Sequence, residues 1–248
     1  MPNPLIQKLE RIAALTEADK HALDAAVAQT RDLAPGVDLV CTGDRPAGCT
    51  VLLEGWACRY KLLPEGKRQI IGFLIPGDLC DLSGLIMGAM DHSVSTLTAA
   101  KVAGISRDLL RGLVDRHPAL ARALWRETLA DAAIAREWVV NVGSRPAYAR
   151  MAHLLCEVGL RLRAVGLADG SRFEFPVTQT DLAAAMGLPT VHVNRTIEEL
   201  RRDGLITWTN SAVVIPDWQR LQEAGSFSPD YLFIEPGEKN PGVQQPVA

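Results

Sequence analysis

The residues most suited to acting on another molecule lie between positions 187 and 206, in the stretch GLPTVHVNRTIEELRRDGLI. Its aliphatic residues follow the i, i+4, i+7 spacing of one helix face: Val193, Ile197 and Leu200. The opposite face begins with the apolar Val191 and then carries three charged residues: Arg195, Glu198 and Arg202. Because an exposed arginine can donate two parallel hydrogen bonds to O6 and N7 of guanine, this face predicts contact with base edges in DNA.

The candidate DNA contacts divide between bases and phosphates. Arg195 is expected to grip a guanine, a contact worth roughly 1–3 kcal/mol of base discrimination. Val191 has no hydrogen bond to donate, but it can lie against the methyl group of thymine. Four further candidates lie on the same helix, and the middle two can read a base edge or hold a phosphate: Thr190, His192, Asn194 and Arg202. Three residues at the start of the preceding helix are placed for phosphate oxygens: Thr178, Gln179 and Thr180.

Two helices joined by a tight turn must position these side chains. Thr178 and Asp181 resemble a capping box, and the helix that they start stops at Gly187. A helix, a tight glycine-containing turn and a second helix form the helix-turn-helix arrangement, whose second helix lies in the major groove. The stretch LITWTNSAVVI that follows predicts a β-hairpin that resembles a wing.

An ordinary surface helix also has one apolar and one charged face, and Glu198 with Arg202 fits a plain i, i+4 ion pair. Segment 144–225 holds nine arginines and no lysine against nine acidic residues, so its charge is balanced. Affinity for DNA would then depend on where the charges lie and on two copies binding together.

The residue pattern of the preceding part of the chain indicates first helices and then β-strands. Residues 4–30 predict one or two short helices, with Thr16 as an N-cap and Glu17 and Asp19 in the first turn. From about residue 33 to 105, short apolar runs separated by glycines predict an all-β sandwich or barrel. The clearest hairpin turns at residues 64–66, and the side chains predicted on one face of it are two apart: Trp56, Cys58, Tyr60 and Leu62, then Gln69, Ile71 and Phe73.

A long helix is predicted from Pro118 to about residue 142. Its apolar residues lie on more than one side: Leu120, Leu124, Leu129, Ala132, Ala133, Val139 and Val142. One side can cover the β domain and another can meet a second copy, although the heptad is not strict. The stretch GSRPAY at 143–148 marks a domain boundary, and the glycines and prolines after residue 225 predict a poorly ordered tail.

Composition excludes several classes of protein. The 248 residues have a net charge of −3, no apolar run long enough to span a membrane and no visible secretory signal, so we expect a cytoplasmic protein. None of the five cysteines lies in a metal-binding pattern, so we expect no metal and reduced thiols, with a redox or haem role left open. Asp78 and Asp81 are a close carboxylate pair, but no catalytic motif accompanies them, so we do not expect an enzyme.

The order of these elements resembles the Crp/Fnr family of bacterial transcription regulators. The segments that carry the resemblance are VLLEGWACRYKLLPEGKRQIIGFLIPGDLCDLSGL and VTQTDLAAAMGLPTVHVNRTIEELRRDGLI, and the second resembles the FixK-type branch most. The resemblance implies an α+β chain with a cyclic-nucleotide-binding-like sensor domain at 1–117, a dimerisation helix at 118–143, a winged helix-turn-helix at 144–225 and the tail at 226–248. It also implies a homodimer on a pseudo-palindromic operator with half-sites about 34 Å apart, and RNA polymerase as a partner.

Two departures from the family concern the effector. The resemblance places the candidate effector pocket at six residues: Asp81, Leu82, Ser83, Gly84, His92 and Ser93. Leu82 stands where cyclic-nucleotide binders have a glutamate for the ribose, and His92-Ser93 stands where they have an Arg-Ser pair for the cyclic phosphate. Leu82 cannot accept a hydrogen bond from a ribose hydroxyl. His92 lacks the planar guanidinium with which arginine donates two hydrogen bonds to a phosphate, so cyclic AMP is not expected to bind. An iron–sulfur cluster is not expected either, because the first cysteine is Cys41, and we expect no cofactor.

The DNA-reading helix also departs from the family. Val191 stands where many members have a glutamate, so operator bases cannot be copied from relatives. Pro189 replaces a frequent capping serine. The alternative to a DNA-binding regulator is a signalling module that binds a cyclic nucleotide or another small molecule and uses its winged helix for protein contacts.

Overall fold

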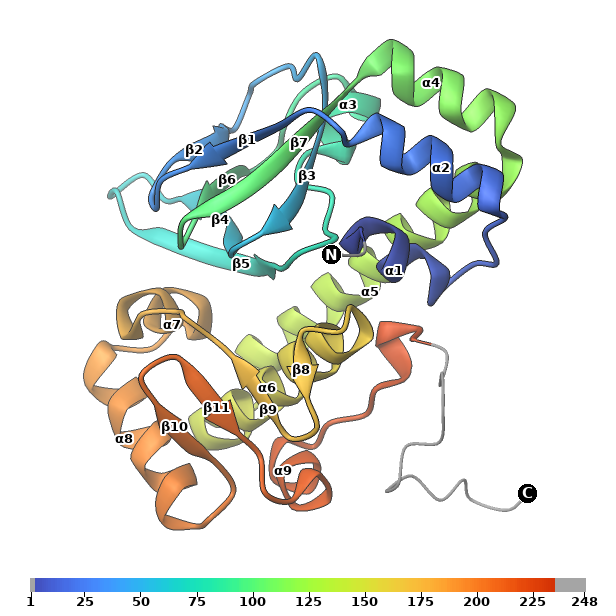
Figure 1. The fold of residues 1–248 in the computed structure, drawn as a ribbon. Helices are drawn as coiled ribbons and strands as arrows, with labels where there is room; N and C mark the ends of the chain where they lie inside the picture. Colours follow the sequence, from blue (N-terminus) through green and yellow to red (C-terminus); the bar gives the residue numbers. More distant parts are fainter. Residues whose placement is uncertain (1–2, 235–248) are drawn as a thin grey trace.

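The computed structural model describes residues 3–234, which form a β-rich domain and a helical domain connected by one long helix (Figure 1). The chain enters through two short helices, α1 (Pro4–Glu10) and α2 (Glu17–Ala26). The predicted N-cap of the second is confirmed, since Asp19 N donates to Thr16 Oγ1 and Thr16 N donates to the Asp19 carboxylate. This reciprocal capping satisfies two backbone donors that the first helical turn leaves free.

Residues 30–106 form two antiparallel sheets, with strand orders β1-β7-β3 and β2-β6-β4-β5. The strands are β1 (Thr30–Leu33), β2 (Asp38–Val40), β3 (Gly48–Glu54), β4 (Ala57–Leu62), β5 (Arg68–Leu74), β6 (Ser93–Thr96) and β7 (Ala100–Ser106). One short helix that the periodicity did not predict, α3 (Leu82–Met87), lies between β5 and β6. The fold class is α+β, as predicted.

The hairpin of β4 and β5 departs from the predicted alternation. Cys58 and Tyr60 are buried as expected, but Leu62 is 63% exposed at the hairpin end. On the return strand Ile70 is buried and Ile71 is 37% exposed, which reverses the prediction. The register shifts between Arg59 and Tyr60, so β5 carries one extra residue there. Such a bulge moves every later side chain to the opposite face of the strand.

Three helices lead from the β domain to the rest of the chain: α4 (Arg107–Arg116), α5 (Pro118–Ser144) and α6 (Ala147–Ala164). Pro118 opens α5, where a missing amide hydrogen costs nothing. Only Arg145 and Pro146 separate α5 from α6, and we call these two residues the hinge. No helix among residues 3–234 is long and apolar enough to cross a membrane.

The second domain adds a small sheet and the two predicted helices. Its elements are β8 (Ala168–Asp169), β9 (Arg172–Glu174), α7 (Gln179–Met186), α8 (Thr190–Arg202), β10 (Thr207–Thr209), β11 (Ala212–Val214), α9 (Trp218–Gly225) and the 3-10 turn η1 (Asp230–Leu232). The predicted wing hairpin is β10–β11, and it joins β9 and β8 in one antiparallel sheet of order β10-β11-β9-β8.

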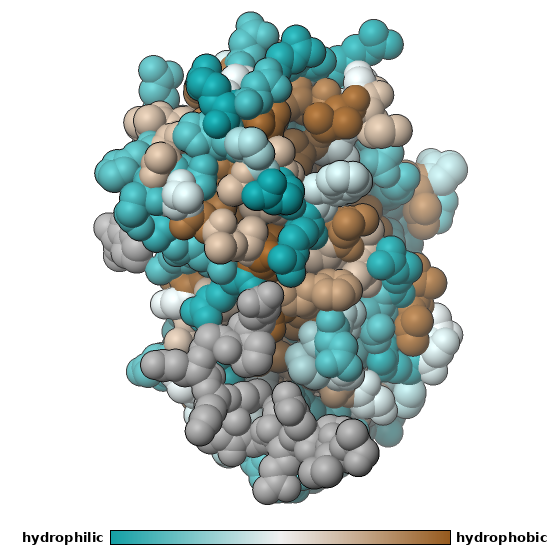
Figure 2. Space-filling model, turned by 90° about the vertical axis from the view of Figure 1, so that its right-hand side faces the viewer, coloured by the Kyte–Doolittle hydropathy of each residue, from teal (hydrophilic) through white to brown (hydrophobic). Residues whose placement is uncertain are grey.

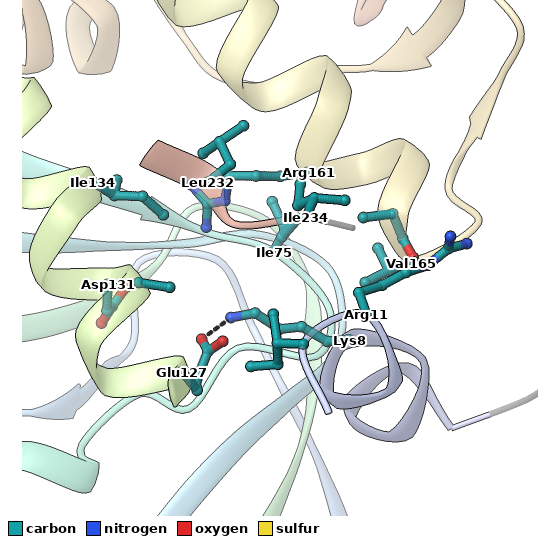
Figure 3. A pocket seen from close by; sticks show the side chains of 13 residues that line it. Lys8, Arg11, Ile75, Glu127, Asp131, Ile134, Arg161, Val165, Leu232 and Ile234 are labelled. Carbon is teal, nitrogen blue, oxygen red and sulfur yellow. Dashed lines mark hydrogen bonds and ion pairs between the residues drawn. The ribbon is translucent and has the colours of Figure 1, made fainter. Parts of the chain in front are cut away.

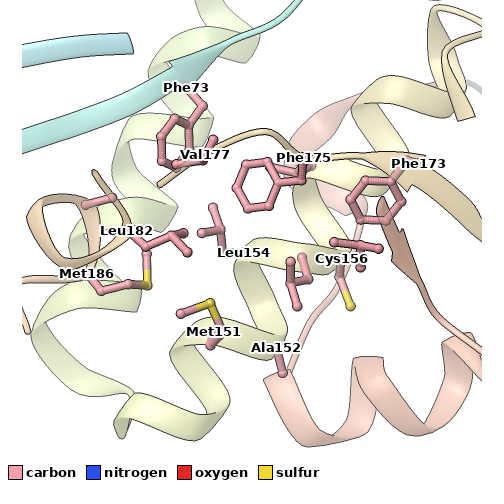
Figure 4. Close-up of a cluster of buried hydrophobic side chains, with 14 of the residues drawn as sticks. Phe73, Met151, Ala152, Leu154, Cys156, Phe173, Phe175, Val177, Leu182 and Met186 are labelled. Carbon is pink, nitrogen blue, oxygen red and sulfur yellow. The ribbon is translucent and has the colours of Figure 1, made fainter. Parts of the chain in front are cut away.

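The two domains share one hydrophobic core. Phe73 of β5 lies 5.6 Å from Phe175 and 5.8 Å from Trp138 of α5, measured between ring centroids. Trp56 lies 5.2 Å from the same Phe175. Figure 4 shows Phe73 reaching from its strand toward Phe175 and Val177 of the helical domain. Aromatic pairs at these distances attract beyond their buried area, so they hold the two domains together.

Segment 226–234 is ordered, which corrects the predicted poorly ordered tail for these residues. Phe227 and Leu232 are buried, and the hydroxyl of Tyr231 donates to Glu157 of α6 at 3.0 Å. The glycines and prolines of the tail led to the prediction, but this segment carries enough apolar surface to bury. The remainder of the predicted tail, residues 235–248, lies outside the described residues.

A buried histidine beneath this segment predicts acid sensitivity of the fold. Burial and the nearby Arg145 cation lower the pKa of His153 to about 4, although Glu137 opposes the shift. In the unfolded chain histidine titrates near pH 6.5, so the unfolded state binds more protons between pH 4 and 6.5. Stability therefore falls as the pH falls through that window, by about 2 kcal/mol from pH 7 to pH 5.

Chemical denaturation at both pH values, with the wild type and His153→Gln, measures this contribution. The variant is expected to lose about 2 kcal/mol less than the wild type between pH 7 and pH 5. Equal losses in the two proteins would mean that His153 does not cause the acid sensitivity.

Candidate nucleic-acid interface

Helix α8 has the two faces that its periodicity predicts. Val193 and Leu200 are fully buried and Ile197 is 9% exposed, which confirms the inward face. On the outward face Val191 is 75% exposed, and the side chain of Arg195 is 77% exposed. The other predicted contacts on this helix are exposed as well: Thr190, His192, Asn194 and Arg202. The helix therefore presents an apolar methyl surface and a guanidinium side by side near its N-terminal end.

The turn before α8 depends on one glycine and one distant arginine. Gly187 ends α7 with φ of 63°, a left-handed conformation that glycine adopts without strain. The guanidinium of Arg150 donates to the carbonyl of Met186 and, at 2.9 Å, to that of Arg145 in the hinge. Arg150 thus ties the end of α7 to the hinge. Sequence reasoning missed it, because the contact joins residues 36 positions apart.

The charged side chains of α8 do not form the i, i+4 ion pair between Glu198 and Arg202 that fitted the sequence. Glu198 accepts a hydrogen bond from Arg201 at 2.8 Å, and Arg202 lies 3.7 Å from Asp203 instead. Arg195 donates through Nε to Glu199 at 3.0 Å. An exposed pair of this kind is worth less than about 1 kcal/mol, so the Arg195 guanidinium can exchange Glu199 for a base.

The start of α7 is exposed, but it also lies near the β domain. Thr178 caps the helix by accepting from Asp181 N at 3.1 Å, and Thr178, Gln179 and Thr180 are all exposed. Asp181 lies 3.7 Å from the guanidinium of Arg68 in β5. Helix α7 is therefore held between α8 and the β domain, an arrangement that the sequence did not predict.

The predicted effector residues are mostly engaged by their neighbours. The carboxylate of Asp81 accepts from Thr50 N at 2.6 Å and from Thr50 Oγ1 at 3.0 Å, so it is turned toward β3. The hydroxyl of Ser93 accepts from Thr42 N at 3.0 Å. Leu82 is half-buried and Ser83 is exposed.

The space over Gly84 is occupied by a side chain, and His92 is buried. A Cβ on Gly84 would clash with the thioether of Met90, so the Met90 side chain lies directly over this glycine. His92 is buried, its Nδ1 lies 2.8 Å from Asp91, and its Nε2 has no hydrogen-bond partner. Only His92, among the six predicted residues, retains an unsatisfied buried polar atom.

A buried charge cluster joins the β domain to α5 and α6. Lys8 of α1 forms ion pairs with Asp78 and with Glu127 of α5, and Arg161 of α6 lies 2.8 Å from Asp78. Burial alone would raise the pKa of Asp78, but the two cations hold it below its ordinary value. The carboxylate is thus ionised and structural, which accounts for one member of the predicted carboxylate pair.

The cysteines are free thiols held in their protonated form. Four of the five are buried, namely Cys49, Cys58, Cys80 and Cys156. Burial raises the pKa of Cys58 to about 12 despite the nearby Arg68, and burial also raises the pKa of the exposed Cys41. Because the thiolate is the reactive species, these surroundings disfavour the redox role that the sequence left open.

Comparison with known proteins agrees with this geometry. Residues 149–224 match the model of the Crp-like helix-turn-helix domain, and residues 30–117 match that of the cyclic nucleotide-binding domain. The nitrogen fixation regulation protein FixK of Bradyrhizobium diazoefficiens is 30% identical over 172 residues, which cover 69% of this chain and 71% of FixK. The transcriptional activator protein FnrL of Cereibacter sphaeroides is 26% identical over 222 residues, 88% of this chain and 89% of FnrL.

The fold of the chain is also similar to that of a solved structure. The solved structure of FixK2 from Bradyrhizobium japonicum superimposes with a TM-score of 0.72 at 23% identity, covering 81% of this chain and 98% of FixK2. The named relatives are transcription regulators and not enzymes. The exposed face of α8, the two domain matches and the FixK relationship together show that this chain is a DNA-binding transcriptional regulator and belongs to the Crp/Fnr family, in its FixK-type branch.

Proposed function

We propose that this regulator binds DNA as a homodimer and reads each half of a pseudo-palindromic operator with α8. The observation that carries the proposal is the exposure of Val191 and Arg195 on a helix whose other face is buried. Arg195 contacts a guanine and Val191 a thymine methyl group. The remaining contacts hold phosphates or flank the bases: Thr178, Gln179, Thr180, Thr190, His192, Asn194 and Arg202.

The surface of α5 supports the homodimer. Trp125 is 71% exposed, Leu129 is 57% exposed and Val139 is 74% exposed, which is unusual for such apolar residues. Together with the exposed Ala132 and Arg136 they are spaced 4, 3, 4 and 3 residues apart, the spacing of a coiled-coil seam. In Figure 2, hydrophobic residues lie among hydrophilic ones along the right-hand edge of the molecule. A second copy of α5 would cover this seam, and the two α8 helices would then read half-sites about 34 Å apart.

A charge in the seam tests the dimer. Leu129→Arg is expected to give a monomer, because pairing would bury two further guanidinium groups where the wild type has apolar side chains. Sedimentation equilibrium measures the mass of the wild type and of the variant at equal concentration. Leu167→Arg is the matched control, since Leu167 is 44% exposed in the helical domain and outside the seam. A dimeric Leu129→Arg variant would contradict the proposed seam.

The β domain is proposed not to take cyclic AMP. Leu82 and His92 lack the chemistry for the ribose and the cyclic phosphate, and Met90 fills the space over Gly84. The domain then serves as a scaffold for the dimer helix or senses another signal. Several relatives are named as activators, which supports RNA polymerase as a partner and the cytoplasm as the place of action.

Selection of bound duplexes from a random pool, with purified protein and no added ligand, tests the proposed function. We expect a two-fold symmetric consensus that cyclic AMP leaves unchanged. Failure to enrich any sequence, with or without cyclic nucleotides, oxidant or reductant, would contradict DNA reading. Enrichment only in the presence of cyclic AMP would contradict the proposal for the β domain.

A further inference from the structure

Segment 226–234 lies beyond the residues that match the helix-turn-helix model, 149–224, yet it packs where the two domains meet. The backbone carbonyl of Ser226 accepts a hydrogen bond from Arg145 of the hinge at 3.3 Å. Phe227 lies 4.9 Å from His153 of α6, between ring centroids, and Leu232 is buried. The segment therefore contacts the hinge and the helix that follows it.

Tyr231 connects the two helices on either side of the hinge. Its hydroxyl donates to Glu157 of α6 at 3.0 Å and lies 3.1 Å from Nε2 of His153. The same Glu157 carboxylate accepts from Nε1 of Trp138 in α5 at 3.1 Å. The ring of Tyr231 also stacks on His153, with planes 12° apart. One buried carboxyl group thus joins α5, α6 and the segment.

The end of the segment lies beside a small cavity between α1, α5 and α6. Leu232 and Ile234 line a cavity together with Ile134 of α5, Arg161 of α6 and Lys8 of α1 (Figure 3). The cavity has a volume of about 40 Å³, which leaves room for only a few water molecules. Residues of four elements therefore meet around this cavity, which is too small to enclose a nucleotide.

We propose that segment 226–234 is a clamp that fixes the angle between α5 and the DNA-binding domain, and that Tyr231 is its positioning residue. Only two residues join α5 to α6, so that angle depends on the contacts that pack around the hinge. In a dimer held through α5, this angle sets the separation of the two α8 helices. The clamp then determines which spacing of half-sites the dimer accepts, an inference that rests on the proposed dimeric DNA binding.

Hydrogen exchange and operator spacing test the clamp together. Tyr231→Phe removes the hydroxyl and keeps the ring, and the double variant Tyr231→Ala/Leu232→Ala removes both anchors. Tyr60→Phe is the matched control, because its hydroxyl donates to Asp38 at 2.9 Å within the β domain alone. We expect amides of residues 141–150 to exchange about tenfold faster in both clamp variants, the factor for one lost buried hydrogen bond.

The DNA measurement uses the selected operator and copies with one base pair added or removed at the centre. The ratio of their Kd values should fall about tenfold in the clamp variants and stay constant in Tyr60→Phe. Unchanged exchange at the hinge in both variants would overturn the clamp, and an unchanged ratio would overturn its role in spacing. If the wild type binds no duplex, the proposed function fails, while the exchange rates still decide whether the segment clamps the hinge.

Discussion

Replacing Arg195 with alanine removes base discrimination at one position of each half-site and weakens operator binding strongly. Each bidentate contact to guanine contributes roughly 1–3 kcal/mol, and a homodimer makes it twice. The variant is therefore expected to lose roughly 2–6 kcal/mol, at least about 30-fold in Kd. Stability should stay near that of the wild type, because Arg195 is exposed and its pair with Glu199 adds little.

Fluorescence anisotropy on the selected operator, and on single-base variants of it, measures both effects. Arg172→Ala is the matched control, since its side chain is 60% exposed and belongs to β9 rather than to α8. The variant should bind all bases equally at one position while the other positions keep their preference. A uniform loss over all positions would assign Arg195 to a phosphate instead of a base.

Replacing Asp78 with asparagine should destabilise the fold more than any other single change considered above. Its carboxylate is 2% exposed and is shared by Lys8 and Arg161, which come from two different helices. Removing one partner of a buried ion pair typically costs about 3–5 kcal/mol. We expect about 3 kcal/mol, at the lower end of that range, because Glu127 and Glu157 still pair with the two cations.

Thermal unfolding measures this loss, which corresponds to about 6–12 °C for a chain of this size. Asp91→Asn is the control, since that carboxylate is 72% exposed and should change stability by less than about 1 kcal/mol. The folded pKa of Asp78 lies below its unfolded value. Its contribution is therefore present above pH about 4 and disappears as the pH falls through the folded pKa. Equal melting of the two variants would show that the cluster adds no stability.

Much of the fold follows from local pattern. The N-cap at Thr16, the break at Pro118 and the glycine after α7 lie where their chemistry predicts, because caps and turns depend on a few neighbouring residues. The strand parity of the hairpin was wrong at Ile71, because a bulge is one extra residue opposite a partner strand. No pattern within β5 itself reveals such a bulge.

The exposed apolar face of α5 could not be predicted from local sequence pattern alone. Apolar residues on several sides obscured the heptad in the sequence. In the structure, burial divides these apolar residues into two faces: Leu120 and Ala123 are buried, while Trp125 and Leu129 are exposed. The repeat becomes visible only once the β domain has covered the other face.

The sequence by itself determined the two faces of α8, because helical periodicity assigns each residue of one helix to a side. Only the tertiary structure decided that Asp78 meets Lys8 and Arg161, which are 70 and 83 positions away, and that Tyr231 meets Glu157. It also decided that Met90 lies over Gly84. Contacts between distant elements depend on how whole elements pack, and that packing has no period that a single stretch of chain can display.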